Sequence, residues 1–302
     1  MIISASRRTD IPARYAEWLY KRLQEGYVLA RNPMRYHQVM RISLAPEDVD
    51  GIVFWTKNPY PMLSQITSLA PYAYYFQFTL TSYSNDMEPG VPLKSSTIIP
   101  TFQRLAELVG PDRVIWRYDP ILFSTKYTTE YHQEYFYEIA RRLFGYTNKC
   151  IISFLDDYRS AGARLQACGL TPVDEAVQTQ LAGTIASTAR SFQMTIETCA
   201  EKMDLSTHGI GHAKCIDGSL LDKIRGYSLK ALKDKNQRPY CGCDASVDIG
   251  SYNTCQNGCL YCYANHAPEL IAKAVREHDP FSPLLTGKIG PSDEIKARAK
   301  RA

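Results

Sequence analysis

Short apolar runs rich in β-branched and aromatic residues recur along the first two thirds of the chain, separated by helix-length segments. Such runs are typical of strands buried on both faces of a parallel sheet. The expected strands are Ile2–Ser4, Ile52–Trp55, Tyr74–Leu80, Val114–Trp116, Cys150–Phe154 and Met194–Ile196. The expected helices are Pro12–Glu25, Ile98–Val109, Thr129–Phe144 and Val173–Ser191. Proline, capping residues and glycine at several of their ends support these boundaries.

Six strand–helix units in a row predict an α/β protein with a wound parallel sheet or a (β/α) barrel, because each parallel pairing needs a crossover connection. Polar and charged residues collect where the expected strands end. In a barrel these ends share one face, where active sites lie, whereas a doubly wound sheet spreads them along an edge. We therefore favour a barrel. The candidate catalytic residues are Arg7, Asp10, Lys57, Asn58, Arg117, Asp119 and Glu197.

The rhythm of strands and helices stops after about Ser206, where glycine-rich, basic and cysteine-rich stretches replace it. No internal repeat or long Gly/Ser linker separates this part from the rest. We expect residues 1–302 to form a single barrel-like domain, with residues 207–302 as a cysteine-rich segment packed on it.

Composition narrows the class of protein. The chain of 302 residues has 35 basic and 31 acidic side chains, 45% apolar residues and a net charge of +4. These values exclude disordered and fibrous proteins, and the charge is too small to predict a nucleic-acid partner by itself. The sequence shows neither an export signal nor an 18-residue apolar window. We expect a cytoplasmic protein with no membrane partner.

Nine cysteines, an odd number in a chain without an export signal, favour metal or redox chemistry over a disulfide framework. Three of them, Cys255, Cys259 and Cys262, have C-x3-C-x2-C spacing, so their thiolates can converge on one metal centre. Structural zinc normally has four protein ligands. A [4Fe–4S] cluster held by three cysteines keeps one iron open for a small molecule.

This motif resembles the signature of radical S-adenosylmethionine (SAM) enzymes, with Tyr261 as the aromatic residue before the third cysteine. The resemblance implies a [4Fe–4S] cluster on Cys255, Cys259 and Cys262, and SAM bound at the open iron. It also implies a partial (β/α) barrel and reductive cleavage of SAM to a 5′-deoxyadenosyl radical. Reduction implies an electron donor such as flavodoxin or ferredoxin.

The radical SAM superfamily normally carries its motif near the N-terminus, after the first barrel strand, whereas here it begins at Cys255. The chain also resembles the uncharacterised family DUF1848, which has a C-terminal radical-SAM-like cysteine cluster. The matching stretches are SASRRTDIP, FWTKNP, RVIWRYDP, QRPYCGC and DIGSYNTCQNGCLYCYAN. If a strand near Ala245–Ile249 precedes Ile2–Ser4 in space, the barrel is circularly permuted.

Six cysteines lie outside the motif. We interpret Cys150 and Cys168 as inert thiols. The other four, Cys199, Cys215, Cys241 and Cys243, are candidates for a second site that holds either an auxiliary [4Fe–4S] cluster or zinc.

The leading functional hypothesis is a radical-SAM-like enzyme acting on a small-molecule or otherwise unknown substrate. One alternative is a binding protein for an anionic partner, stabilised by zinc or a closed iron–sulfur cluster. A second is nucleic-acid repair of the kind performed by spore photoproduct lyase, with strand-end cations meeting phosphates. The sequence contains no G-x-G-x-x-G, P-loop or G-x-S-x-G motif that would support other common enzyme classes.

Overall fold

The computed structural model describes residues 1–155, 168–228, 231–238 and 240–298. Its largest element is an eight-stranded sheet with strand order β10-β1-β4-β5-β6-β7-β8-β9, in which every pairing is parallel. These strands are β10 (Ser246–Asp248), β1 (Ile2–Ala5), β4 (Gly51–Thr56), β5 (Tyr74–Thr79), β6 (Val114–Ile121), β7 (Lys149–Phe154), β8 (Thr195–Thr198) and β9 (Gly211–His212). This architecture confirms the α/β class and is compatible with a partial barrel or a Rossmann-like sheet.

The expected helices form with changes at their ends. The segment 12–25 divides into α1 (Ile11–Arg14) and α2 (Ala16–Glu25), because Tyr15 has non-helical backbone angles. Its buried hydroxyl donates to the carbonyl of Thr254 at 2.6 Å, which fixes the break against the segment leading to the cysteine motif. The other expected helices appear as α3 (Ile99–Val109), α4 (Thr129–Leu143) and α6 (Glu175–Ser191).

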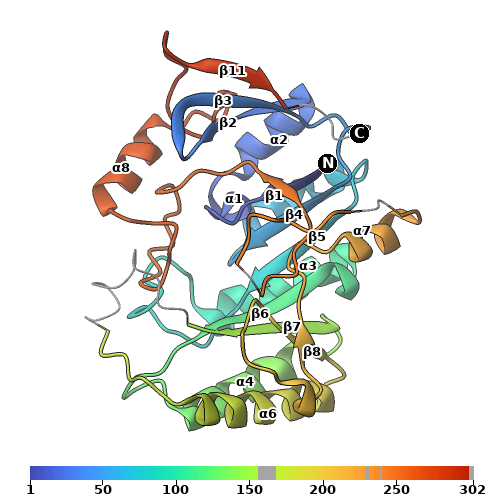
Figure 1. Ribbon diagram of the computed structural model, residues 1–302, viewed down its shortest axis with the longest axis vertical. Helices are drawn as coiled ribbons and strands as arrows, with labels where there is room; N and C mark the ends of the chain where they lie inside the picture. The colour runs from blue at the N-terminus through green and yellow to red at the C-terminus, as the bar shows by residue number, and fades with distance from the viewer. Residues whose placement is uncertain (156–167, 229–230, 239, 299–302) are drawn as a thin grey trace.

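A smaller, three-stranded sheet lies at one end of the molecule beside α8 (Pro268–Glu277), as Figure 1 shows. It contains β2 (Tyr27–Asn32), β3 (Arg35–Ser43) and β11 (Glu294–Ala297). β2 and β3 form an antiparallel hairpin, and β11 pairs parallel with β3. None of the strands expected from the sequence corresponds to a strand of this smaller sheet.

The two faces of the large sheet bury different parts of the chain. Alternate strand residues, such as Phe54 and Trp116, form one core with helices α2, α3, α4 and α6. Residues of the opposite parity, such as Val53 and Ile151, form a second core with segment 213–224. That segment includes α7 (Gly218–Arg225), drawn in orange in Figure 1. Helices α2, α3, α4 and α6 therefore cover one face, and a late part of the chain that includes α7 covers the other.

The pairing of β10 with β1 joins two segments that lie far apart in the sequence. Ile2 is in register with Ser246, and Ser4 with Asp248. The Asp248 carboxylate accepts hydrogen bonds from the hydroxyls of Ser4 and Ser6 and from the amide of Arg7. β10 is therefore the first strand in space although it is among the last in sequence. No helix among the described residues is long and apolar enough to cross a membrane.

Candidate functional site

The three motif cysteines lie on the loop that follows β10, at the edge where the strand order begins. Cys255 and Cys259 are buried, and Cys262 is half-buried. The thiol of Cys259 interacts electrostatically with those of both Cys255 and Cys262. The thiols of Cys255 and Cys262 also interact electrostatically with each other. The structure therefore brings the three predicted ligands into one neighbourhood.

The cysteine loop is docked on residues from two other parts of the chain. Arg14, at the end of α1, donates from Nη2 to Asn257 Oδ1 at 2.9 Å and to the carbonyl of Gly90 at 2.8 Å. The Gly90 amide donates to the Asn257 carbonyl at 2.9 Å, and the Leu260 amide to that of Met87 at 3.0 Å. These bonds fix the loop backbone between α1 and segment 87–90.

Gly90 is required at this contact for steric reasons. A Cβ atom added there would lie 2.3 Å from the backbone oxygen of Gln256, far inside normal contact distance. We expect Gly90→Ala to displace the loop, destabilise the protein by about 1–3 kcal/mol and lower the iron bound after anaerobic reconstitution. Iron analysis and urea unfolding measure both effects.

Gly211→Ala is the matched control, because a Cβ atom at Gly211 meets nothing within 4 Å. We expect this control to bind iron like the unmodified protein. Equal iron content in the Gly90 and Gly211 variants would contradict the proposed role of the contact.

A buried ionic network lies beside Cys259. Glu88 is 1% exposed, and its Oε1 accepts from Lys57 Nζ at 2.7 Å and from Thr81 Oγ1 at 2.7 Å. Lys94 binds the other carboxylate oxygen, and the hydroxyl of Tyr261 donates to Oε1. Lys57 also donates to the Tyr261 hydroxyl at 2.9 Å. Two cations and one carboxylate leave a net positive charge next to the loop.

The network sets the protonation states around the loop. Burial alone would raise the pKa of Glu88, but the two lysines outweigh it and lower that pKa to about 2. Burial raises the pKa of Cys255 to about 12 and that of Cys259 further still, although Lys57 opposes the shift at Cys259. The thiols of Cys255 and Cys259 are therefore neutral until a metal displaces their protons, so metal binding should release protons.

Among the predicted strand-end residues, Asp10 and Lys57 adjoin the cysteine loop. Asp10 Oδ1 caps α1 through the Ala13 amide at 3.0 Å, while Oδ2 accepts from the Lys57 amide at 2.8 Å and from Asn257 Nδ2 at 3.1 Å. Burial raises the pKa of Asp10, and four hydrogen-bond donors oppose the shift. Asp10 therefore links β1, β4 and the loop.

Other predicted site residues lie in different surroundings. Arg7 donates from Nη2 to Ser246 Oγ at 3.0 Å. The Asn58 side chain accepts from the Tyr60 amide at the start of the 3-10 helix η1 (Tyr60–Leu69). Glu197 pairs with Lys149, the first residue of β7, at 2.9 Å. Each of these side chains is thus engaged within the protein.

Arg117 and Asp119 form a buried ion pair beside the second group of cysteines. Asp119 also accepts from the hydroxyl of Ser153, and Arg117 Nη1 lies 2.9 Å from Cys215 Sγ. The sequence analysis predicted both residues from their positions at the end of a strand.

Of the buried ionic network, the sequence analysis predicted Lys57 but neither Glu88 nor Lys94. Glu88 and Lys94 belong to a connection without apolar periodicity, so no sequence signal pointed to them.

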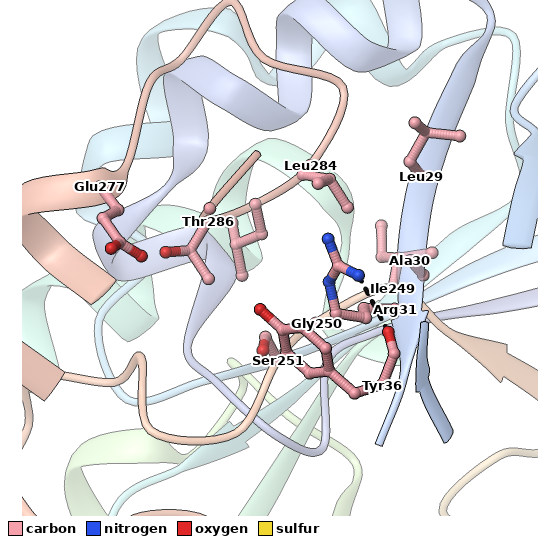
Figure 2. A pocket seen from close by; sticks show the side chains of 12 residues that line it. Leu29, Ala30, Arg31, Tyr36, Ile249, Gly250, Ser251, Glu277, Leu284 and Thr286 are labelled. Atoms are coloured by element: carbon pink, nitrogen blue, oxygen red, sulfur yellow. Dashed lines mark hydrogen bonds between the residues drawn. The ribbon is translucent and has the colours of Figure 1, made fainter. Parts of the chain in front are cut away.

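A cavity of about 100 Å³ lies near the segment that leads into the cysteine loop, between β2 and α8. Figure 2 shows Arg31, Ser251, Glu277 and Thr286 around it. Arg31 is held by Asp293 at 2.7 Å, and the lining contains none of the cysteines. We therefore place the candidate site at the cysteine loop, where the ionisable groups converge.

Within the described ranges, no group of three or more His, Cys, Asp or Glu side chains is already arranged to hold a metal ion. The donor set of the loop nevertheless suits an iron–sulfur cluster, whose cysteines each bind a different iron atom. Asn265 adds a polar group: its Nδ2 donates to the Cys255 carbonyl at 2.8 Å, and its buried Oδ1 has no partner among the described residues.

The fold and the site define an α/β protein with a cysteine loop at the edge of a parallel sheet. The chain belongs to DUF1848, a family described as a domain of unknown function, whose model matches residues 2–264. The match extends through the cysteine loop. Searches of curated proteins and of solved structures found no match.

Proposed function

We propose that this protein is a radical-SAM-like iron–sulfur enzyme that cleaves SAM reductively and starts radical chemistry on a substrate still to be identified. One observation carries the proposal: three thiols with the spacing of that superfamily interact with one another on the loop after the spatially first strand. This position corresponds to the one that the superfamily motif occupies after its first barrel strand.

The strand order supports a circularly permuted partial barrel. Once β10 is placed first, the remaining strands β1, β4, β5, β6, β7, β8 and β9 follow in sequence order. A doubly wound sheet reverses its order at a switch point and carries helices on both faces. Continuous order and helices gathered on one face favour winding in one direction, as in a barrel.

Three cysteines would hold three of the four irons and keep one iron free for SAM. When bound and reduced, such a cluster supplies the electron that splits SAM into methionine and a 5′-deoxyadenosyl radical. Lys57 and Lys94 both interact electrostatically with Cys259. They would offset the negative charge that accumulates when the buried thiols lose their protons.

The same contacts assign positioning roles to several groups. Tyr261 ties the loop to Glu88 and Lys57 through its hydroxyl, and its ring lies 5.8 Å from that of Tyr83. Asp10 holds Asn257 and the Lys57 backbone. These groups orient the loop, while the open iron and the neighbouring strand ends would receive SAM and substrate.

The test is an anaerobic reaction of the reconstituted protein with SAM and dithionite, followed by chromatography. We expect 5′-deoxyadenosine and methionine in equal amounts, with none formed by Cys259→Ala, and a change in the electron paramagnetic resonance of the reduced cluster on SAM addition. A fully reconstituted [4Fe–4S] protein that neither cleaves SAM nor changes its spectrum when SAM is added would overturn the proposal.

A further inference from the structure

Four cysteines outside the loop come together on the sheet face opposite to α3, α4 and α6. They arrive from the end of β8, from the connection before α7, and from the segment before β10. The Sγ atoms of Cys199 and Cys215 lie 3.2 Å apart. Cys215 also contacts the thiol of Cys243, which in turn contacts that of Cys241. The four sulfurs thus form a continuous chain of contacts.

The backbone around these sulfurs is firmly held. The hydroxyl of Tyr75 and Nε2 of Gln77 both donate to the Cys215 carbonyl, at 2.7 and 2.9 Å. The Ile216 amide donates to Cys243 Sγ at 3.4 Å, and Asp244 accepts from the amide of Gly218 at 2.8 Å. Strand β5 therefore fixes the connection that carries Cys215, and this connection contacts Cys243.

A buried cation accompanies the sulfurs. Arg117 is 4% exposed, and its Nη1 lies 2.9 Å from Cys215 Sγ. Four thiolates around a divalent ion carry a net charge of about −2, so a buried tetrathiolate site needs a counter-charge. The guanidinium of Arg117 lies at the sulfurs and provides part of that charge, which it shares with its ion-pair partner Asp119.

The spacing distinguishes between kinds of metal site. Two thiolates bound to one tetrahedral zinc ion, with bonds of about 2.3 Å, lie about 3.8 Å apart. The cysteines of a [4Fe–4S] cluster bind different irons, so their sulfurs stand farther apart than those around a single ion. The 3.2 Å separation of Cys199 and Cys215 is shorter than the single-ion spacing, so these two thiols need to move apart only slightly to share one ion, and both are free.

We propose that Cys199, Cys215, Cys241 and Cys243 bind a single tetrahedral Zn²⁺ ion beside the guanidinium of Arg117. Because these side chains are not yet arranged around one centre, binding includes rotation about their Cα–Cβ bonds. The site would fasten the segments before α7 and before β10 to the end of β8. It has four protein ligands and keeps no open position, which is typical of structural zinc.

The test uses a background in which Cys255, Cys259 and Cys262 are all alanine, so that iron at the loop does not contribute. We expect this protein, purified anaerobically without chelators, to contain about one zinc per chain by elemental analysis. Adding Cys215→Ser should remove the zinc, whereas the control Cys168→Ser should retain it. This background also separates the inference from the proposed function, since loss of SAM cleavage leaves its zinc content unchanged.

Cobalt provides a readout that needs no substitution among the four proposed zinc ligands. We expect Co²⁺ to replace zinc in the same background and to give the visible absorption bands of a tetrahedral thiolate site. Iron with sulfide in place of zinc, zinc retained in the Cys215→Ser protein, or a Cys199–Cys215 disulfide in the anaerobically purified protein would each overturn the proposal.

Discussion

Replacing Cys255, Cys259 and Cys262 together by alanine is expected to reduce the iron content after anaerobic reconstitution from about four atoms per chain to none. The three thiols share one loop, and burial raises the pKa values of Cys255 and Cys259, so these two stay protonated until a cluster takes them as ligands. Their removal leaves no alternative donor in the loop. Iron and sulfide analysis, together with visible absorption, measures the loss.

Cys150→Ala and Cys168→Ala are the controls for this prediction. Cys150 is buried in the core beneath the helices, and Cys168 packs at its margin, so neither belongs to a cysteine group. We expect both to retain the full cluster. If the triple variant keeps the iron and absorption of the unmodified protein, the three cysteines are not the ligands.

Glu88→Gln is expected to lower the free energy of unfolding by about 3–5 kcal/mol, because it leaves two buried lysines without their carboxylate. The side chain of Glu88 is fully buried, and those of Lys57 and Lys94 are mostly buried. Glutamine keeps the shape of the side chain and removes only its charge. Urea unfolding at neutral pH measures the effect.

Asp86→Asn is the matched control, since the Asp86–Lys126 pair has the same chemistry with both side chains about half exposed. Exposed pairs contribute about 0–1 kcal/mol, so we expect little change. Equal losses of unfolding free energy in Asp86→Asn and Glu88→Gln would contradict the role of Glu88 as the carboxylate that neutralises two buried lysines.

The loss of unfolding free energy caused by Glu88→Gln should also depend on pH. The folded protein holds the pKa of this carboxyl at about 2, below its ordinary value of 4.5. Its contribution to stability is therefore complete above pH 4.5 and disappears as the pH falls through the folded pKa. We expect the difference in unfolding free energy between the unmodified protein and Glu88→Gln to narrow between about pH 5 and pH 2. A difference independent of pH would exclude an electrostatic origin.

The large sheet was predictable because its strands are buried on both faces. The apolar runs at Ile2–Ser4, Ile52–Trp55 and Cys150–Phe154 all lie within observed strands. The hairpin of β2 and β3 was not predicted, because β3 carries Arg35, His37 and Arg41 between its apolar residues. Its stability comes from pairing and from contacts with distant segments, which local sequence does not reveal.

The candidate site was predictable only in part. Cysteine spacing identified the candidate ligands in the loop, and strand ends identified Asp10 and Lys57 beside them. Glu88 was not predicted, because the sequence does not distinguish a buried carboxylate in an irregular connection from a solvent-exposed one. Glu197 was predicted as a site residue, but in the structure it forms an ion pair with Lys149. This pair depends on the register of β7 and β8, which the sequence alone does not reveal.

The pairing of β10 with β1 also has a consequence for biosynthesis. The pairing partner of Ile2 is Ser246, which the ribosome adds 244 residues later. At the usual ribosomal rate of about 5–20 residues per second, the wait lasts about 12–50 seconds. During this time β1 can pair with β4 on one side only, and an unpaired strand edge invites contacts with other chains. The nascent chain therefore exposes this edge of β1 until β10 has been made, and the cysteine loop, which follows β10, is made only afterwards.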